Sequence, residues 1–319
     1  MSMEEPATVD GCQARLERRY KGRIDEVALE ERGPLQVTVR FRGTHVNEHG
    51  EERLPFIIRL RLCTDDVQLH FQHTFLYDGD EGKDFLRGIG LACDVPLTGA
   101  AYDRHLKLAG DHGVLHETMV GLTSWRPRLP AELYQRQMSG EILGNIDPNT
   151  ELGQKVTQVL SAVPYWSAYD FCQDSAEHFF LRKKLAPEDC CWLDALHGSR
   201  ARGVLAFSGE RGGLMSCVRD GWQKYPSGCT VTGLDTNTAV CRIWFRHPTA
   251  EAMDFRHYAQ RGYNQVCYEG YDYKGATPYG IACTSECDIL PIAGGIPGDH
   301  IMLDFAQTIH QPPIYVAEP

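Results

Sequence analysis

The sequence has no excess of basic residues. Its 319 residues include 32 Lys and Arg against 43 Asp and Glu, which gives a formal net charge of −11. A protein that binds nucleic acid needs basic side chains to neutralise phosphates, so we expect no nucleic-acid partner. An acidic sugar remains compatible with this composition, because a local basic cleft can lie on an acidic protein.

Long apolar runs are also missing. No stretch of about 18 apolar residues is present, so we expect no membrane span and no membrane partner. The first residues, MSMEEPATVDGCQ, lack the basic and apolar regions of a secretory signal, and the chain as written would be cytoplasmic. Its twelve cysteines are irregularly spaced, and without export we expect free thiols rather than disulfides.

The motifs of cofactor and metal chemistry are incomplete. RGIGLAC lacks the third glycine of a dinucleotide fingerprint, GERGGL lacks the Gly-Lys-Ser/Thr of a P-loop, and no Gly-x-Ser-x-Gly elbow is present. His112 and His116 do not belong to an HExxH motif, and Cys283 and Cys287 lack a second cysteine pair. We therefore expect no cofactor and no metal.

The sequence does contain many short alternating segments. LQVTVRF at 35–41, FIIRLRL at 56–62 and VQLHFQHTF at 67–75 each place apolar residues on one face. Further strands are expected at 178–185, 202–208 and 214–220, and on both sides of Asp235-Thr-Asn. This pattern predicts a mainly β fold, a large antiparallel, supersandwich-like β-sandwich. Its expected core includes Val37, Val39, Leu60, Leu69, Phe71 and Phe75.

Two segments have helical periodicity, so the fold should include a few short helices. TELGQKVTQVLSA at 150–162 places its leucines and valines near one face. DHIMLDFAQTI at 299–309 begins with Asp299 as the expected N-cap and ends before a Pro-Pro pair.

The segment MDFRHY at 253–258 carries the most suggestive chemistry. Its alternation predicts a strand with Asp254, Arg256 and Tyr258 on one side and His257 on the other. An arginine can fork onto a carboxylate, and a tyrosine can act as acid or base. The alternative is a solvated strand face with an Asp–Arg pair.

Three other stretches combine aromatic and polar side chains. YEGYDYKGATPYG contributes Glu269, Tyr271 and Tyr279 around a Gly–Pro turn. DGWQKYP offers Trp222 as a stacking surface and Lys224 as a cation for a carboxylate, and GLTSWRPR offers Trp125 beside two arginines. Each stretch has an alternative in which the aromatic rings simply anchor a surface loop.

Seven blocks occur in a familiar order. They are ERGPLQVTVRFRG, HTFLYDGDEGKDFLRGIGL, DRHLKLAG, GVLHETMVGLTSW, GGLMSCVRDGWQKYP, AMDFRHY and GATPYGIACTSE. Together they resemble the central β-sandwich of the exo-acting rhamnogalacturonan lyases and the related YetA-like proteins. The resemblance covers residues 31–286.

This resemblance implies an architecture of three parts: an N-terminal β-barrel, a central sandwich and a catalytic C-terminal α/α toroid. On that basis residues 1–30 are expected to be a tail, the remnant of an upstream barrel. Residues 31–290 would form the central sandwich. Residues 291–319 would form a linker and the first helix of a truncated toroid, so that most of the catalytic domain would be missing.

The resemblance also implies a β-elimination next to a galacturonate carboxylate. Such a reaction needs a cation at the carboxylate and a group that takes the proton. Arg256 or Lys224 would hold the carboxylate, His257 or Tyr258 would carry the proton, and Tyr279 would supply a hydroxyl contact.

Three interpretations follow. The first is a polysaccharide lyase-like protein acting on an acidic plant cell-wall polysaccharide or oligosaccharide. The second is a non-catalytic carbohydrate-binding sandwich. The third is a fragment that works only with a missing toroid domain, which would fit the absent signal because family members are often secreted.

Overall fold

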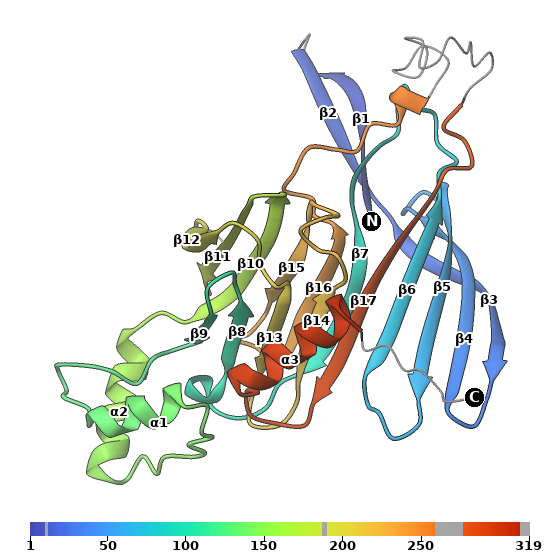
Figure 1. The fold of residues 1–319 in the computed structure, drawn as a ribbon. Helices are drawn as coiled ribbons and strands as arrows, with labels where there is room; N and C mark the ends of the chain where they lie inside the picture. The colour runs from blue at the N-terminus through green and yellow to red at the C-terminus, as the bar shows by residue number, and fades with distance from the viewer. Residues whose placement is uncertain (10–11, 187–189, 259–276, 313–319) are drawn as a thin grey trace. The chain divides into compact units, whose positions relative to one another are not determined.

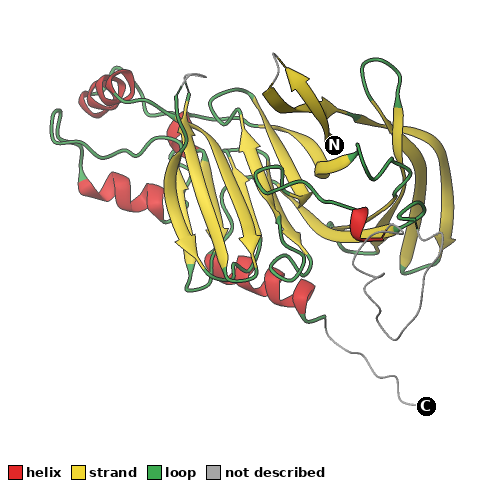
Figure 2. Ribbon diagram, turned by 90° about the horizontal axis from the view of Figure 1, so that it is seen from above, coloured by secondary structure: helices red, strands yellow, loops and turns green. Residues whose placement is uncertain are grey.

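A computed structural model describes residues 1–9, 12–186, 190–258 and 277–312 (Figures 1 and 2). Within these ranges the strands form two large antiparallel sheets and the helices are few, which confirms the predicted mainly β sandwich. The chain divides into two compact units. Unit 1 comprises Met1–Gly90 and Phe245–Cys287, and unit 2 comprises Leu91–Trp244 and Asp288–Pro319. The division falls inside β7, β16 and β17.

The described elements are the following, in chain order. The first strands and the first 3-10 turn are β1 (Ser2–Val9), β2 (Cys12–Arg19), β3 (Lys21–Arg32), β4 (Gln36–Val46), β5 (Glu52–Cys63), β6 (Leu69–Leu76), β7 (Phe85–Pro96) and η1 (Ala101–Asp103). The middle elements are β8 (His105–Ala109), β9 (Val114–Thr118), α1 (Ala131–Met138), α2 (Glu151–Ala162), β10 (Trp166–Ser175), β11 (His178–Leu185) and β12 (Leu193–Gly198). The last are β13 (Val204–Ser208), β14 (Gly213–Val218), β15 (Ser227–Thr232), β16 (Thr238–Arg246), η2 (Arg256–Tyr258), β17 (Ala282–Ile292) and α3 (Asp299–His310).

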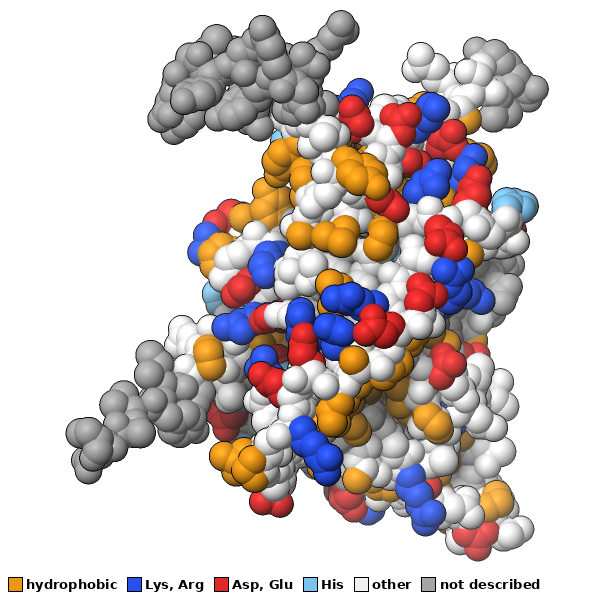
Figure 3. Space-filling view, turned by 90° about the vertical axis from the view of Figure 1, so that its right-hand side faces the viewer, with side chains coloured by type: hydrophobic (Ala, Val, Ile, Leu, Met, Phe, Trp, Pro, Cys, Tyr) orange, Lys and Arg blue, Asp and Glu red, His pale blue; other side chains and the backbone are white. Residues whose placement is uncertain are grey.

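Unit 1 is built on the antiparallel run β3-β4-β5-β6. The predicted strands at 35–41, 56–62 and 67–75 correspond to β4, β5 and β6. Basic and acidic side chains alternate on one face of this run (Figure 3), where Arg40 lies 2.9 Å from Glu26 and 3.8 Å from Glu30. Because its arginines already face carboxylates, this face offers little net positive charge to an anionic ligand.

The opposite face of β4, β5 and β6 is apolar but only partly covered. Among the expected core residues, Phe75 is buried at 3% exposure. The other five side chains are all half-buried. The core prediction was therefore wrong in degree for five of its six residues. Alternation determines which side chains share a face, but it does not say whether another layer covers that face.

The first thirty residues, expected to form a tail, are extended. β1 and β2 form a hairpin, β1 also pairs with the start of β7, and β3 pairs with β4 along almost its whole length. The domain boundaries given above remain a prediction.

Unit 2 contains two strand groups, β12-β11-β10-β15-β16 and β14-β13-β8-β9. Helix α3 packs on the second group, where Met302, Phe305 and Ile309 join a buried cluster with Ala109 and Met215. The helix predicted at 299–309 is confirmed, but its N-cap is Gly298 rather than Asp299. Asp299 is instead the first helical residue, and its carboxylate accepts a 2.7 Å bond from Lys107 Nζ.

Leu133 of α1 and Val156 of α2 belong to a second buried cluster in unit 2, together with Tyr102 and Leu122. The predicted helix at 150–162 is confirmed as α2, with the Thr150 hydroxyl capping Gly153 N–H at 3.0 Å. In the part of the chain that the structure covers, no helix is both long and apolar enough to cross a bilayer.

Candidate functional site

The segment predicted as the strand MDFRHY is not a strand. Only Met253 makes a bridge, to Leu86, and Arg256–Tyr258 form the 3-10 turn η2. Phe255 fixes this conformation, because its buried ring stacks on Tyr77 with centroids 4.0 Å apart. The predicted division into a polar and an apolar strand face is therefore wrong, and His257 is no longer forced to point away from Arg256.

Arg256 is engaged by its neighbour Asp254. Its Nε–H donates to both carboxylate oxygens, at 3.0 and 2.9 Å, and its Nη2 donates to Oδ2 at 2.5 Å. These hydrogen bonds raise the pKa of Arg256 and lower that of Asp254. The guanidinium also lies over the ring of Phe85, 5.2 Å from its centroid. Its Nη1 has no hydrogen-bond partner among the residues described.

Arg256 opens onto a cleft of about 750 Å³ in unit 1. The lining residues come from the β1–β2 hairpin, the start of β7 and the segment before η2: Pro6, Ala7, Thr8, Gln13, Ala14, Arg15, Phe85, Glu251, Ala252, Asp254 and Arg256. Arg15 supplies a second guanidinium, held by Glu4 at 2.9 Å and lying 3.6 Å from Glu251. Nη1 of Arg15 donates the hydrogen bond to Glu4, and among the described residues its Nε and Nη2 donate no hydrogen bond.

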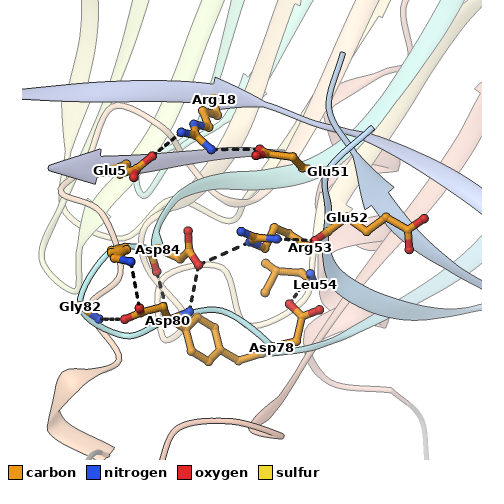
Figure 4. Close-up of polar contacts among 12 residues, drawn as sticks. Glu5, Arg18, Glu51, Glu52, Arg53, Leu54, Asp78, Asp80, Gly82 and Asp84 are labelled. Atoms are coloured by element: carbon orange, nitrogen blue, oxygen red, sulfur yellow. Dashed lines mark hydrogen bonds and ion pairs between the residues drawn. The ribbon is translucent and has the colours of Figure 1, made fainter. Parts of the chain in front are cut away.

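A polar network fixes the start of β7, and with it Phe85 (Figure 4). The Asp84 carboxylate accepts from Asp80 N–H at 2.9 Å and pairs with Arg53 at 3.4 Å. The hydroxyl of Tyr77 donates to the Asp84 carbonyl at 3.1 Å. Through Tyr77 this network supports both walls of the cleft, since Phe85 follows Asp84 and Phe255 stacks on Tyr77.

The other predicted catalytic residues lie in the same part of unit 1. The rings of His257 and Tyr258 touch, with centroids 3.9 Å apart, and Tyr258 is 41% exposed. Tyr279 is 68% exposed and precedes Gly280, whose N–H donates to the Tyr77 carbonyl at 2.7 Å. Tyr77 therefore anchors both η2 and the turn that carries Tyr279. Glu269 and Tyr271 lie outside the described residues.

Trp222 and Lys224 belong to unit 2, in the turn after β14. Trp222 is half-buried, lies 4.2 Å from the Arg200 guanidinium, which sits over its ring, and lines a small cavity of about 10 Å³ with Gln173 and Ser216. Lys224 Nζ lies 3.9 Å from Asp220. These contacts match a packed surface turn, because one face of the indole is already covered by an arginine.

Trp125 is also in unit 2 and is 85% exposed. It bridges to Arg128, whose guanidinium lies 5.9 Å from the ring centroid. The rest of the Trp125 ring is exposed to solvent. In the ranges that the structure describes, no three His, Cys, Asp or Glu side chains gather closely enough to hold a metal ion.

Sequence reasoning missed three of the five charged or aromatic residues that line the cleft. Arg15 lies in the segment interpreted as a tail, Phe85 lies inside a block used only for the family resemblance, and Glu251 precedes the MDFRHY stretch. The β1–β2 hairpin supplied no local signal, because its three arginines are balanced by three glutamates. The proximity of the missed residues depends on the pairing of β1 with β7, two strands that are about eighty residues apart in sequence. Such a pairing cannot be predicted from local sequence.

Comparison with known proteins identifies relatives. A family model described as "PcRGLX-like protein central beta sandwich domain" matches residues 1–306. The protein named "Uncharacterized protein YetA" from Bacillus subtilis strain 168 is 34% identical over 307 residues. That match covers 95% of this chain and 35% of the relative, so the chain spans about a third of the length of the curated relative.

Solved structures give weaker matches. A putative aldose 1-epimerase from Escherichia coli K12 is 10% identical, with 84% of this chain and 69% of that chain covered and a TM-score of 0.30. Galactose 1-epimerase from Lactobacillus acidophilus NCFM is also 10% identical, with coverages of 86% and 67% and a TM-score of 0.30. Overlaps of this quality do not define a shared topology.

Proposed function

Because the chain belongs to the PcRGLX-like family, as its central β-sandwich domain, we propose that it binds an acidic oligosaccharide in the cleft of Arg15, Phe85 and Arg256. The family model and the YetA relative confirm the family part of the resemblance predicted from the seven sequence blocks. The proposed ligand is a galacturonate-containing segment of the rhamnogalacturonan type, and the chain would be the saccharide-binding sandwich of a polysaccharide lyase-like protein.

One observation carries this proposal: two guanidinium groups with unused N–H donors line one cleft beside an aromatic ring. A sugar carboxylate can accept two parallel hydrogen bonds from an arginine, and Arg15 retains Nε and Nη2 for such a contact. Glu4, Glu251 and Asp254 hold the two guanidinium groups in place and reduce their net charge. The preference for an acidic sugar therefore rests on the remaining N–H donors, because a hydrogen bond from a guanidinium to a carboxylate is stronger than one to a neutral hydroxyl. The cleft volume of about 750 Å³ is in the range of small-ligand sites.

Within this proposal, elimination would use the groups on η2. Arg256 would neutralise the carboxylate, and His257 or Tyr258 would take the proton on the neighbouring carbon. The electron pair of that C–H bond would form the sugar double bond as the next C–O glycosidic bond breaks, and the leaving oxygen would take a proton from an acid or from water. Tyr279 would contact a hydroxyl from the adjacent turn. Lys224, Trp222 and Trp125 remain candidates for separate saccharide contacts in unit 2.

A non-catalytic binding module is the second candidate, and the Asp254 contact favours it. Arg256 already spends two of its three nitrogens on Asp254, so less of its charge is available to stabilise an enolate. Ultraviolet absorbance separates the two candidates, because elimination creates a sugar double bond and binding alone does not.

We expect Arg15→Ala and Arg256→Ala each to weaken binding of a rhamnogalacturonan oligosaccharide by about 10- to 100-fold, since a hydrogen bond to a charged group contributes roughly 1.5–3 kcal/mol. Titration calorimetry measures this loss. Arg136→Ala is the matched control: Arg136 is 53% exposed and is also held by one carboxylate, that of Glu141, but it lies in unit 2.

The ligand supplies a second control. An oligosaccharide whose carboxyl groups have been reduced to alcohols should bind wild type as weakly as the acidic form binds Arg15→Ala. The affinity of this reduced oligosaccharide should fall little further on Arg15→Ala, because reduction of the carboxyl group and removal of the arginine abolish the same contact. Equal affinity of wild type for both ligands, or an equal loss with Arg136→Ala, would refute the cleft as the acidic-sugar site.

A further inference from the structure

Two histidines face each other on neighbouring strands of unit 2. His178 begins β11 and His197 lies near the end of β12, and Nε2 of His178 is 3.2 Å from Nδ1 of His197. Their side chains are 45% and 51% exposed. We propose that this pair binds one divalent transition-metal ion, independently of the saccharide cleft.

The distance between the two nitrogens suits a shared metal ion. Imidazole nitrogens bind zinc at about 2.0–2.1 Å, so two of them on a tetrahedral ion lie roughly 3.3 Å apart. The observed 3.2 Å is close to that value before any side chain moves. An ion can therefore replace the direct contact between the rings with small rotations.

Each histidine has a carboxylate at its other ring nitrogen. Asp174 Oδ1 is 2.8 Å from Nδ1 of His178, so that nitrogen carries the proton and Nε2 presents a lone pair. In the metal-free contact Nδ1 of His197 carries the proton and donates to that lone pair. A metal ion would displace this proton to Nε2 of His197, which faces Asp194 Oδ2 3.7 Å away. A carboxylate behind a ligating imidazole orients the ring and strengthens it as a ligand. The two carboxylates also make the surroundings favourable for a cation.

The backbone that carries the pair is held rigidly. Gln173, 1% exposed, donates from Nε2 to the carbonyls of His178 and Ser199 at 3.1 and 2.7 Å. Gly198 lets β12 approach closely, because a Cβ there would lie 2.4 Å from the Phe179 ring. The two strands are thus fixed on both sides of the histidines, and little ordering is left for the metal to impose.

The site has two protein ligands. No third His, Cys, Asp or Glu joins them among the described residues, so water or an anion would fill the remaining positions. Nitrogen ligands of this kind follow the Irving–Williams order. We therefore expect Cu²⁺ to bind more tightly than Ni²⁺ or Zn²⁺.

The test is a titration of the untagged, chelator-stripped chain with Cu²⁺, Ni²⁺ and Zn²⁺ salts, read by calorimetry and by the melting temperature. Wild type should bind one equivalent and melt at a higher temperature with metal. His178→Ala and His197→Ala should each abolish that equivalent, and Asp174→Asn should weaken it by about 10- to 100-fold. The electron paramagnetic resonance spectrum of bound Cu²⁺ should show two nitrogen ligands.

His49→Ala is the control, since His49 is 76% exposed and its ring lies 3.5 Å from Glu48. It should leave the titration unchanged. Because both proposed ligands are half-exposed, their alanine variants should melt like wild type without metal, which separates loss of binding from loss of folding. Binding that survives the double variant His178→Ala/His197→Ala, or no binding by wild type, would overturn the proposal.

Discussion

Acidification from pH 6 to pH 5 should lower the free energy of unfolding by roughly 3–5 kcal/mol. The cause is a set of four histidines, three buried and His116 half-buried, whose removal from water keeps them neutral in the native state. Burial lowers their pKa values to about 4, 3, 3 and 4 in the order His45, His73, His105 and His116. Each unit contains two of them, so the effect is not confined to one part of the chain.

The direction follows from where each state takes up protons. An unfolded histidine is protonated below about pH 6.5, whereas these native histidines stay neutral until about pH 3–4. Above pH 6.5 neither state binds these protons, so the histidines do not lower the free energy of unfolding. Between the unfolded and the native pKa only the unfolded state binds these protons. Each of the four histidines therefore lowers the free energy of unfolding by about 1.4 kcal/mol for each pH unit of acidification in this range.

Urea unfolding at pH 7, 6 and 5 measures this slope, and His73→Phe tests its origin. The His73 ring is stacked against Phe56 and Phe245, with centroids 5.9 and 5.5 Å away, so phenylalanine fits the same aromatic stack. The variant should be more stable than wild type at pH 5 and should lose about a quarter of the slope. His49→Gln, at an exposed position, should keep the full slope. A stability that is flat from pH 7 to pH 5 would contradict the assignment of these histidines as buried neutral groups.

Local sequence pattern predicted the strands and helices well where each element has a clear period. The segment HFFLRKKL was predicted with the bounds of β11, and Thr150 caps α2 at the position where the helical pattern begins. In both cases neighbouring residues alone supply the signal, through alternation or through a hydroxyl placed before the first helical turn.

The failures have long-range causes. MDFRHY alternates like a strand, but the stacking of Phe255 on Tyr77, which is remote in sequence, fixes a 3-10 turn instead. The block DRHLKLAG was used only for the family resemblance, and its local pattern does not show that Asp103, Arg104, His105 and Lys107 are all buried. Most of their partners lie on other segments of the chain. The Asp103 carboxylate, for example, accepts from the N–H groups of Leu143 and Gly144 at 2.8 and 2.9 Å.

The same limit applies to the candidate site. Arg256 was predicted as a site residue from its own segment, MDFRHY. The alternative interpretation of that segment included an Asp–Arg pair, and Arg256 does pair with Asp254. Arg15 and Phe85 were missed as partners because they reach the cleft only through the pairing of β1 with β7 and through the network around Asp84. Residue type can therefore nominate one side chain of a site, while the topology decides which others join it.

Asp299→Ala should destabilise the chain by about 2–3 kcal/mol. The side chain of Lys107 is 7% exposed, and its ammonium donates to Asp299 Oδ1 at 2.7 Å and to the Pro297 carbonyl at 3.0 Å. Removing one partner of a buried ion pair typically costs about 3–5 kcal/mol, because the remaining charge stays buried without compensation. The lower value applies here because Asp299 is 59% exposed and the Pro297 carbonyl still accepts one hydrogen bond.

Lys107→Met distinguishes this electrostatic cause from simple loss of contact with α3. Methionine fills a similar volume without a charge to solvate, so this variant should lie within about 1 kcal/mol of wild type. The double variant Lys107→Met/Asp299→Ala should then recover most of the stability lost in Asp299→Ala, which urea unfolding of all four proteins measures as a coupling energy. If Asp299→Ala unfolds like wild type, Lys107 must already be solvated. α3 would then be held on the sheet by Met302, Phe305 and Ile309 alone.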